Sequence, residues 1–263
     1  MTTIRLLATP SGRFRVALDG PDDAPALVLS NSLGTPLEMW DAQATAFSGH
    51  FRVVRYDIRG HGQSDAPTGP YTIGMLGTDV LSVLDSLGIA RADFCGISMG
   101  GLTGLWLGAF AGDRIGRLVV ANSAARIGSP EGWLARARQV REAGLRELAL
   151  SAPTRWFTQE FAAAQSEIVA SAQRWLLETS LEGYAACCEA LASADLRPQL
   201  SRISASTLLI AGKQDPVTTV ADAQEMAASI PNARLAVIPA SHLSNVESPS
   251  TFDDLLKAFL LNP

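Results

Sequence analysis

The feature that most constrains this chain is a Gly-x-Ser-x-Gly pentapeptide at residues 96–100, between a short apolar stretch and a glycine-rich helical stretch. An apolar strand that turns abruptly into a helix forces its central residue, Ser98, into strained dihedral angles. The glycines two residues before and two residues after it avoid a collision at the turn. The pattern therefore predicts that Ser98 projects from the carboxyl end of a sheet, close to helix N–H groups that can bind an anion.

Apolar segments and helical segments alternate on both sides of this turn. Residues 26–30 are a continuous apolar run, which is typical of a strand buried on both faces of a parallel sheet. Residues 117–122 contain the apolar stretch Leu-Val-Val-Ala and predict another buried strand. Residues 3–18 alternate apolar and polar side chains around a Pro-Ser-Gly turn, as a β-hairpin does. Strands and helices that alternate at short intervals predict an α/β fold with a mostly parallel, doubly wound sheet.

This alternation stops at residue 122, and the next apolar strand begins only at residue 207. Connections in such sheets are normally far shorter. The intervening segment is rich in Ala, Leu, Arg and Glu, and its Pro130 and Pro153 are suited to the first turn of a helix. We therefore predict a core of residues 1–122 and 206–263. Residues 123–205 are expected to form an all-helical cap over the carboxyl edge of the sheet, where ligands bind in such folds.

The composition argues against several classes of protein. A net charge of −5 and the lack of any Lys/Arg cluster argue against a nucleic-acid partner. The apolar runs are shorter than the ~20 residues of a membrane-spanning helix, and the N-terminus lacks the pattern of a secretory signal. The three cysteines have no metal-ligand spacing. We therefore expect reduced thiols, no metal site and a cytoplasmic protein without a membrane partner.

A serine hydroxyl becomes a good nucleophile only when a base accepts its proton, and the chain has just three histidines. His50 precedes a strand, on the side of the sheet away from Ser98. His61 lies in a glycine-rich loop, where a turn or surface role is expected. His242 directly follows the last predicted strand, at the carboxyl edge, and is therefore the expected base.

The Gly-x-Ser-x-Gly turn between a strand and a helix resembles the nucleophile elbow of the α/β-hydrolases, which implies an α/β-hydrolase fold with the chain order serine, acid, histidine. The acid that orients this histidine should therefore lie between Ser98 and His242 and directly after a strand. Asp215 meets both conditions, whereas Asp222 and Glu225 fall within the next helix. The alternative position for the acid, after the preceding strand, holds Asn122 and Ser123, neither of which is ionised. Asp215 is therefore the expected acid.

An oxyanion hole needs two preorganised N–H donors. Met99 follows the nucleophile and begins its helix, so its backbone N–H is expected to supply one. The second should come from the loop after residues 26–30, where many α/β-hydrolases have His-Gly-x and this chain has Asn-Ser-Leu-Gly. By alignment with that pattern, the second donor is expected to be the backbone N–H of Leu33.

Several short segments carry a more specific signal: residues 30–35 (Ser-Asn-Ser-Leu-Gly-Thr), Met39-Trp40, residues 124–128 (Ala-Ala-Arg-Ile-Gly), 155–158 (Arg-Trp-Phe-Thr), 183–188 (Gly-Tyr-Ala-Ala-Cys-Cys) and 242–247 (His-Leu-Ser-Asn-Val-Glu). They extend over nearly the whole chain and include the inserted segment, where α/β-hydrolase subfamilies differ most. Together they resemble the 3-oxoadipate enol-lactonases, a family within the α/β-hydrolases.

This resemblance implies hydrolysis of 3-oxoadipate enol-lactone to 3-oxoadipate, in the β-ketoadipate route of aromatic degradation, with no metal or organic cofactor. Ser98 would attack the lactone carbonyl and form an acyl-enzyme. The substrate also carries a free carboxylate, so we expect a cation in the pocket. Arg126, at the entry to the cap, and Trp133 are the candidates for contacts with this small anionic lactone.

Two other interpretations remain open at the level of the sequence. The first is another cofactor-free α/β-hydrolase with the same triad, such as a carboxylesterase or a C–C bond hydrolase. The second is a ligand receptor of the same fold that retains the triad, which slow turnover and a changed cap surface on binding would distinguish. A dehalogenase or epoxide hydrolase is disfavoured because Asp would replace Ser98.

Overall fold

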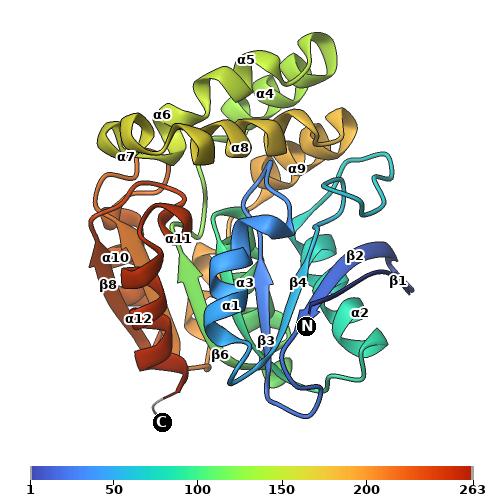
Figure 1. The fold of residues 1–263 in the computed structure, drawn as a ribbon, viewed down its shortest axis with the longest axis vertical. Coiled ribbons are helices and arrows are strands. Elements are labelled where there is room, and N and C mark those ends of the chain that lie inside the picture. Colours follow the sequence, from blue (N-terminus) through green and yellow to red (C-terminus); the bar gives the residue numbers. More distant parts are fainter. Residues whose placement is uncertain (1, 262–263) are drawn as a thin grey trace.

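A computed structural model describes residues 2–261 and contains one eight-stranded sheet (Figure 1). The first two strands form an antiparallel hairpin, the second pairs antiparallel with the fourth, and the remaining strands are parallel. Their order across the sheet is β1-β2-β4-β3-β5-β6-β7-β8. The strands are β1 (Thr3–Thr9), β2 (Gly12–Asp19), β3 (Ala26–Ser30), β4 (Arg52–Tyr56), β5 (Ala92–Ile97), β6 (Ile115–Ala121), β7 (Thr207–Gly212) and β8 (Ala233–Ile238).

Helices cover both faces of this sheet. Helix α1 (Asp41–Phe47) contacts α12 (Pro249–Leu260), and both lie in front of the sheet in Figure 1. On the other face α2 (Ile73–Ser86) packs on α3 (Met99–Phe110), and α10 (Val220–Ser229) continues that layer. The predicted doubly wound, mostly parallel sheet is therefore confirmed.

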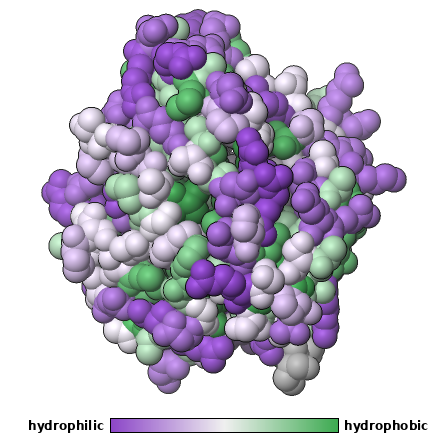
Figure 2. Space-filling view, turned by 180° about the vertical axis from the view of Figure 1, so that it is seen from behind, coloured by the Kyte–Doolittle hydropathy of each residue, from purple (hydrophilic) through white to green (hydrophobic). Residues whose placement is uncertain are grey.

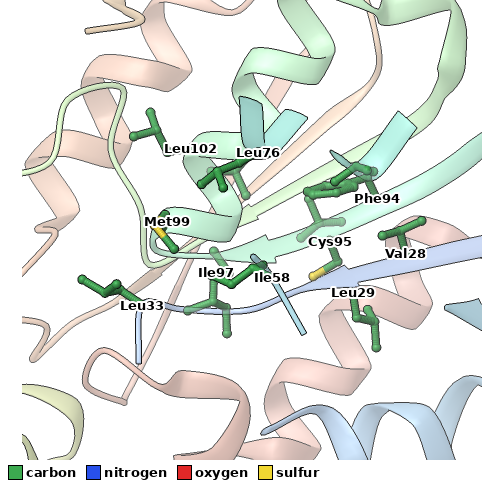
Figure 3. Packing of buried hydrophobic residues seen from close by; sticks show 14 of the residues in the cluster. Val28, Leu29, Leu33, Ile58, Leu76, Phe94, Cys95, Ile97, Met99 and Leu102 are labelled. Atoms are coloured by element: carbon green, nitrogen blue, oxygen red, sulfur yellow. The ribbon is translucent and has the colours of Figure 1, made fainter. Parts of the chain in front are cut away.

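The central strands are apolar because both of their faces are covered. All residues of β3 and of β7 are buried. Val28 and Leu29 of β3 lie beside Phe94 and Cys95 of β5, in parallel register (Figure 3). The same register pairs Ser30 with Gly96, so β3 and β5 end together and the loop after β3 is brought next to Ser98.

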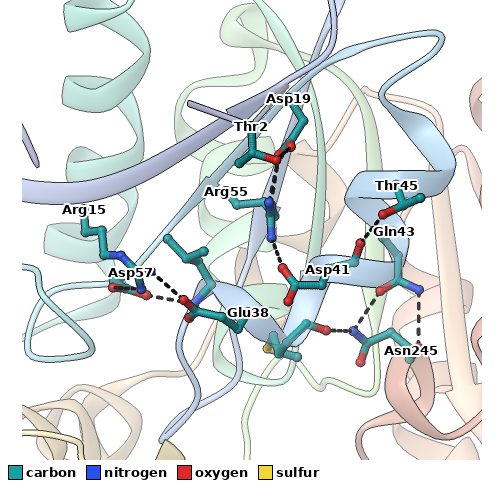
Figure 4. A network of polar contacts seen from close by, with 12 residues as sticks. Thr2, Arg15, Asp19, Glu38, Asp41, Gln43, Thr45, Arg55, Asp57 and Asn245 are labelled. Carbon is teal, nitrogen blue, oxygen red and sulfur yellow. Dashed lines mark hydrogen bonds and ion pairs between the residues drawn. The ribbon is translucent and has the colours of Figure 1, made fainter. Parts of the chain in front are cut away.

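Polar side chains hold the loops that follow the strands (Figure 4). The buried carboxylate of Asp57 accepts, at 2.8 Å, the first backbone N–H of the short helix η1 (Leu37–Trp40). Asn245 belongs to α11 (Ser244–Glu247), and its side-chain amide donates at 2.8 Å to the backbone carbonyl of Met39 in η1. The loop after β3 and the loop after β8 are thereby joined through η1.

The segment between β6 and β7 contains helices and no strand, which confirms its predicted all-helical character. Pro130 and Pro153 begin two of these helices, as predicted. The last element, η3 (Arg197–Arg202), packs on α3 and α10 of the core. The others form the layer at the top of Figure 1: α4 (Pro130–Ala143), α5 (Arg146–Ser151), α6 (Pro153–Trp156), α7 (Gln159–Ala164), α8 (Ser166–Leu177) and α9 (Leu181–Ser193).

This helical cap contacts the core through α9. The backbone of Gly183, in the first turn of α9, lies against that of Gly60, in the loop after β4. A Cβ atom on Gly60 would be 2.4 Å from the Cα atom of Gly183, and the converse distance is 2.3 Å. Within the cap, Arg141 of α4 makes ion pairs with Glu182 and Glu189 of α9, so the two longest contacting cap helices are held together.

Hydrophobic and hydrophilic residues are intermixed on the face shown in Figure 2. Within residues 2–261, no helix combines the length and the apolar character needed to cross a membrane.

Candidate active site

Ser98 occupies the turn between β5 and α3 with φ 56° and ψ −118°. A residue other than glycine rarely adopts a positive φ, and such strain is concentrated at functional sites. The two flanking glycines permit the turn, because a Cβ atom on Gly96 would lie 2.3 Å from the Gly100 carbonyl carbon. A Cβ atom on Gly100 would lie 2.2 Å from the Ser30 carbonyl oxygen. The strained strand-to-helix turn predicted for Ser98 is therefore present.

Asp215 and His242 form a buried hydrogen-bonded pair at the ends of β7 and β8. The Nδ1 atom of His242 lies 2.8 Å from Oδ2 of Asp215, and both side chains are almost completely buried. Burial alone would raise the pKa of Asp215, but the attraction of His242 and hydrogen bonds from His242, Asn122 and the Val217 N–H lower this pKa to about 2. The carboxylate is therefore ionised at neutral pH and holds the imidazole by its Nδ1 atom.

Two residues that sequence analysis did not assign to the site support this carboxylate. Oδ2 of Asp215 accepts hydrogen bonds from Asn122 Nδ2 at 2.9 Å and from Thr218 Oγ1 at 2.8 Å. Asn122 is in turn fixed by Ser244, whose hydroxyl donates to Asn122 Oδ1 at 2.5 Å. From the sequence, Asn122 is only an un-ionised residue at the alternative position for the acid. Its position directly after β6 was the available signal for a supporting role.

Ser98 and His242 line one pocket of about 300 Å³ between the core and the cap. Among residues 2–261 no hydrogen bond joins the two side chains, and such contacts commonly tighten only when substrate is bound. The core contributes Ser32, Leu33 and Val217 to the wall, and the cap contributes the aromatic residues Trp133, Trp156 and Tyr184 together with two arginines. None of the residues that line the pocket carries a carboxylate.

The backbone N–H groups of Leu33 and Met99 lie at the carboxyl ends of β3 and β5. Figure 3 shows both side chains at the same end of the buried cluster, close to Ile97. Leu33 lines the pocket and Met99 is the first residue of α3. Within the described part of the chain neither N–H donates a hydrogen bond. Both can therefore donate to an oxygen atom of a ligand.

The two arginines of the pocket, Arg136 of α4 and Arg155 of α6, have no acidic partner. The Arg136 guanidinium lies 4.7 Å from the centre of the Trp133 ring. Burial, and then repulsion by Arg136, lower the pKa of Arg155. Across residues 2–261 neither guanidinium makes an ion pair with a carboxylate. The pocket that Ser98 and His242 line therefore also contains, on its cap wall, two cations without a counter-ion among the described residues.

Comparison with known proteins identifies the family. The sequence model of the family described as alpha/beta hydrolase fold matches residues 25–249. The chain is 53% identical to 3-oxoadipate enol-lactonase 2 of Acinetobacter baylyi over 92% of this chain and 90% of that protein. The chain belongs to the 3-oxoadipate enol-lactonase family of α/β-hydrolases.

Two further relatives agree with this assignment. The chain is 48% identical to 3-oxoadipate enol-lactonase 1 of Acinetobacter baylyi, over 93% of this chain and 92% of that one. The crystal structure of the enol-lactonase from Burkholderia xenovorans LB400 superposes with a TM-score of 0.96 at 46% identity, covering 98% of this chain and all of that chain. The family resemblance and the α/β-hydrolase fold predicted from the sequence are thus confirmed.

Of the two residues that the enol-lactonase resemblance suggested for substrate contact, the structure brings only one to Ser98. Trp133 lines the Ser98 pocket, and its Nε1 atom donates to the Ile127 carbonyl at 2.5 Å. Arg126 lines a neighbouring pocket, where Asp222 and Glu225 are also found. Arg136 was not singled out, although it follows Trp133 by three residues and so lies on the same helix face.

The sequence gives no metal-binding spacing, and the described residues contain no group of three or more His, Cys, Asp or Glu side chains that could hold a metal ion. The three cysteines, Cys95, Cys187 and Cys188, are free and buried.

Proposed function

We propose that this chain hydrolyses 3-oxoadipate enol-lactone to 3-oxoadipate, as a step in the degradation of aromatic compounds by the β-ketoadipate route. The observation that carries the proposal is the pair Arg136 and Arg155, which line the same small pocket as Ser98 and make no ion pair with a carboxylate within residues 2–261. Both side chains are partly buried, and a partly desolvated cation is stabilised by a nearby anion, so the pocket suits a ligand that brings its own carboxylate. The names of the relatives support the choice of this lactone.

In the first half of the reaction, Ser98 attacks the lactone carbonyl while His242 Nε2 accepts its proton. Asp215 holds His242 through Nδ1, fixes its tautomer and stabilises the imidazolium that forms. The negative charge of the tetrahedral intermediate develops between the Leu33 and Met99 N–H groups, which the protein leaves unpaired.

In the second half, His242 donates its proton to the departing enol oxygen, and the ring opens to an acyl-enzyme. The leaving group remains tethered to the acyl chain and could close the ring again. Its tautomerisation to the ketone removes that nucleophile, so ring opening becomes effectively one-way. Water, activated by His242, then releases 3-oxoadipate from Ser98.

The substrate carboxylate is assigned to Arg136 and Arg155 rather than to Arg126. Guanidinium groups can bind a carboxylate through two parallel hydrogen bonds. Arg155 is held from behind by the Ser151 hydroxyl, to which its Nη1 atom donates at 3.0 Å. Arg136 is held over the Trp133 ring. Trp133 thereby contributes to the anion site through the arginine that it supports.

The test is turnover of the purified protein on 3-oxoadipate enol-lactone, produced in place from muconolactone by its isomerase. A Ser98→Ala variant and the neutral ester p-nitrophenyl acetate serve as controls. Fast lactone loss that the variant abolishes, together with slow ester cleavage, is the expected result. Ser98-dependent cleavage of the neutral ester without lactone turnover would make the chain a carboxylesterase and reject the lactonase proposal. Turnover of neither compound would favour a ligand receptor.

A further inference from the structure

His61 is buried directly behind the loop that carries the Leu33 N–H. It is 1% exposed and belongs to the glycine-rich loop after β4. The backbone N–H of Gly34 donates to Nε2 of His61 at 2.9 Å, and Nδ1 lies 3.2 Å from the carbonyl oxygen of Arg59. An Nε2 atom that accepts a hydrogen bond carries no proton. The single proton of the neutral ring is therefore on Nδ1, where it is donated to Arg59.

The environment keeps this imidazole neutral. Burial lowers the pKa of His61 to about 4, although the hydrogen bond to the Arg59 carbonyl acts in the opposite direction. At neutral pH the ring therefore has one donor and one acceptor, and both are used. No capacity remains for a proton-transfer role.

The Arg59 end of this connection is anchored in the core. The Arg59 guanidinium binds the buried carboxylate of Asp79 through two hydrogen bonds and lies 5.2 Å from the centre of the Tyr71 ring. The same Arg59 carbonyl accepts a contact from Cys187 Sγ at 3.9 Å. His61 thus connects a fixed point of the core to Gly34.

The Gly34 end lies in a turn whose geometry determines where Leu33 N–H points. The Ser32 carbonyl accepts from the Thr35 hydroxyl at 2.9 Å and from the Thr35 N–H at 3.3 Å. In a planar trans peptide the C=O and N–H point in opposite directions. The Leu33 N–H, which shares a peptide plane with the Ser32 carbonyl, is therefore directed away from Thr35. His61 fixes the next peptide plane, between Leu33 and Gly34.

We propose that His61 is a positioning residue for the oxyanion hole, which holds the Gly34 N–H so that the Leu33 N–H stays directed at the oxyanion formed on Ser98. The inference rests on the proposed Ser98 mechanism. It gives a role in the reaction to a histidine that touches neither the nucleophile nor the base. An N–H displaced by about 1 Å would stabilise the transition state less and leave substrate binding nearly unchanged.

Asparagine and glutamine at position 61 separate the two hydrogen bonds. The glutamine amide reaches the place of Nε2 and can accept from Gly34 N–H, whereas the asparagine amide reaches the place of Nδ1 and can only donate to Arg59. His61→Leu lacks both bonds. Tyr71→Phe is the matched control, because it removes a buried hydroxyl that donates to the Pro67 carbonyl in the same neighbourhood.

Two measurements separate the role of His61 from the identity of the substrate. The first is kcat and KM for lactone hydrolysis. The second is the rate at which a fluorophosphonate probe modifies Ser98, followed by mass spectrometry, because this reaction also develops charge in the oxyanion hole but needs no particular substrate. Thermal unfolding of each variant is measured alongside.

We expect His61→Leu and His61→Asn to lower kcat and the labelling rate by roughly 10- to 100-fold with KM changed less than about 3-fold. His61→Gln and Tyr71→Phe should stay within about 3-fold of the unaltered protein. Equal activity of the Asn and Gln variants, or a rise in KM at constant kcat, would overturn the inference. Labelling that follows this pattern without lactone turnover would reject the substrate and keep the role of His61. Failure of the unaltered protein to label would overturn both.

Discussion

The pocket has two walls of different character. On the core wall the acid and the base are already paired: Asp215 binds His242, Asn122 and Thr218 before any ligand arrives. On the cap wall the guanidinium groups of Arg136 and Arg155 have no counter-ion among the residues that the structure describes. Groups that are already held in place by hydrogen bonds stabilise a transition state without reorganisation. The two guanidinium groups, in contrast, gain an anionic partner only when a ligand with a carboxylate binds. In the proposed mechanism, the core wall carries out the chemistry and the cap wall selects the substrate.

The largest effect on activity is expected when His242, the proposed base of the core wall, is removed. His242→Ala should lower kcat for lactone hydrolysis at least about 10⁴-fold and leave KM within a few-fold, because the interaction lost exists mainly in the transition state. His50→Ala, which alters an exposed histidine away from the pocket, is the matched control and should retain full activity. Residual activity of His242→Ala within 100-fold of the unaltered protein would mean that another group is the base.

The cap wall is tested by removing its charges one at a time. Arg155→Met and Arg136→Met should each raise KM for the anionic lactone roughly 10- to 100-fold, because a charge-assisted hydrogen bond contributes about 1.5–3 kcal/mol. Cleavage of p-nitrophenyl acetate, which has no carboxylate, should change little.

Arg126→Met provides the control for this wall, since Arg126 lines the neighbouring pocket. Its KM for the lactone should be unaltered. A larger effect at Arg126 than at Arg136 and Arg155 would reverse the assignment of the carboxylate.

The paired state of the core wall should also appear in the pH dependence of stability. The pKa of Asp215 is lowered to about 2 in the folded protein, below the usual value of about 3.9 for the unfolded chain. The ionised group therefore stabilises the folded state above about pH 4, by about 2 kcal/mol, and this contribution is lost as the pH falls from about 4 towards 2.

Urea unfolding of the unaltered protein and of Asp215→Asn measures this contribution. The difference in the free energy of unfolding should be largest at pH 7 and should shrink between pH 4 and pH 3. A difference that is constant over this range would show that Asp215 titrates alike in both states.

The smallest effect is expected where the two walls meet. Glu247 accepts the Ser241 N–H at 2.8 Å, next to His242, and also accepts the N–H and the hydroxyl of Thr158, between α6 and α7. Glu247→Gln can satisfy only part of this set and should lower kcat/KM by about 5-fold, corresponding to about 1 kcal/mol.

Thr158→Val and the double variant complete a double-mutant cycle at this junction. A coupling energy near zero would indicate that the core and cap walls are positioned independently.

The sequence predicted most of the core wall because each of its residues directly follows a strand. Ser98, Asp215 and His242 could be placed at one edge from the strand pattern together with the chain order serine, acid, histidine, and the structure brings Asp215 and His242 into contact. The support from Asn122 could not be predicted in the same way. It depends on the loop after β7 returning to the end of β6, which is a tertiary contact between separate strands.

The cap wall was less predictable for a related reason. Arg126, Arg136 and Arg155 belong to one inserted segment, and nothing local distinguishes an arginine of the Ser98 pocket from one beside it. Which helix face meets the core is decided by packing of whole helices. The role of His61 was likewise hidden, because a glycine-rich loop suggests only a turn, whereas the hydrogen bond to Gly34 joins residues distant in the sequence.

The contact between Gly60 and Gly183 has a consequence for the evolution and engineering of this scaffold. Because main chain rests on main chain there, with 2.3–2.4 Å from either hypothetical Cβ atom to the opposite Cα atom, no side chain can be exchanged to adapt one partner to the other. A helical insert grafted from a relative would need a glycine at the position of Gly183, because any other residue there would displace the insert from the core. Changes to the pocket-facing residues of the insert leave this contact intact, whereas a side chain at either glycine would force the two main chains apart.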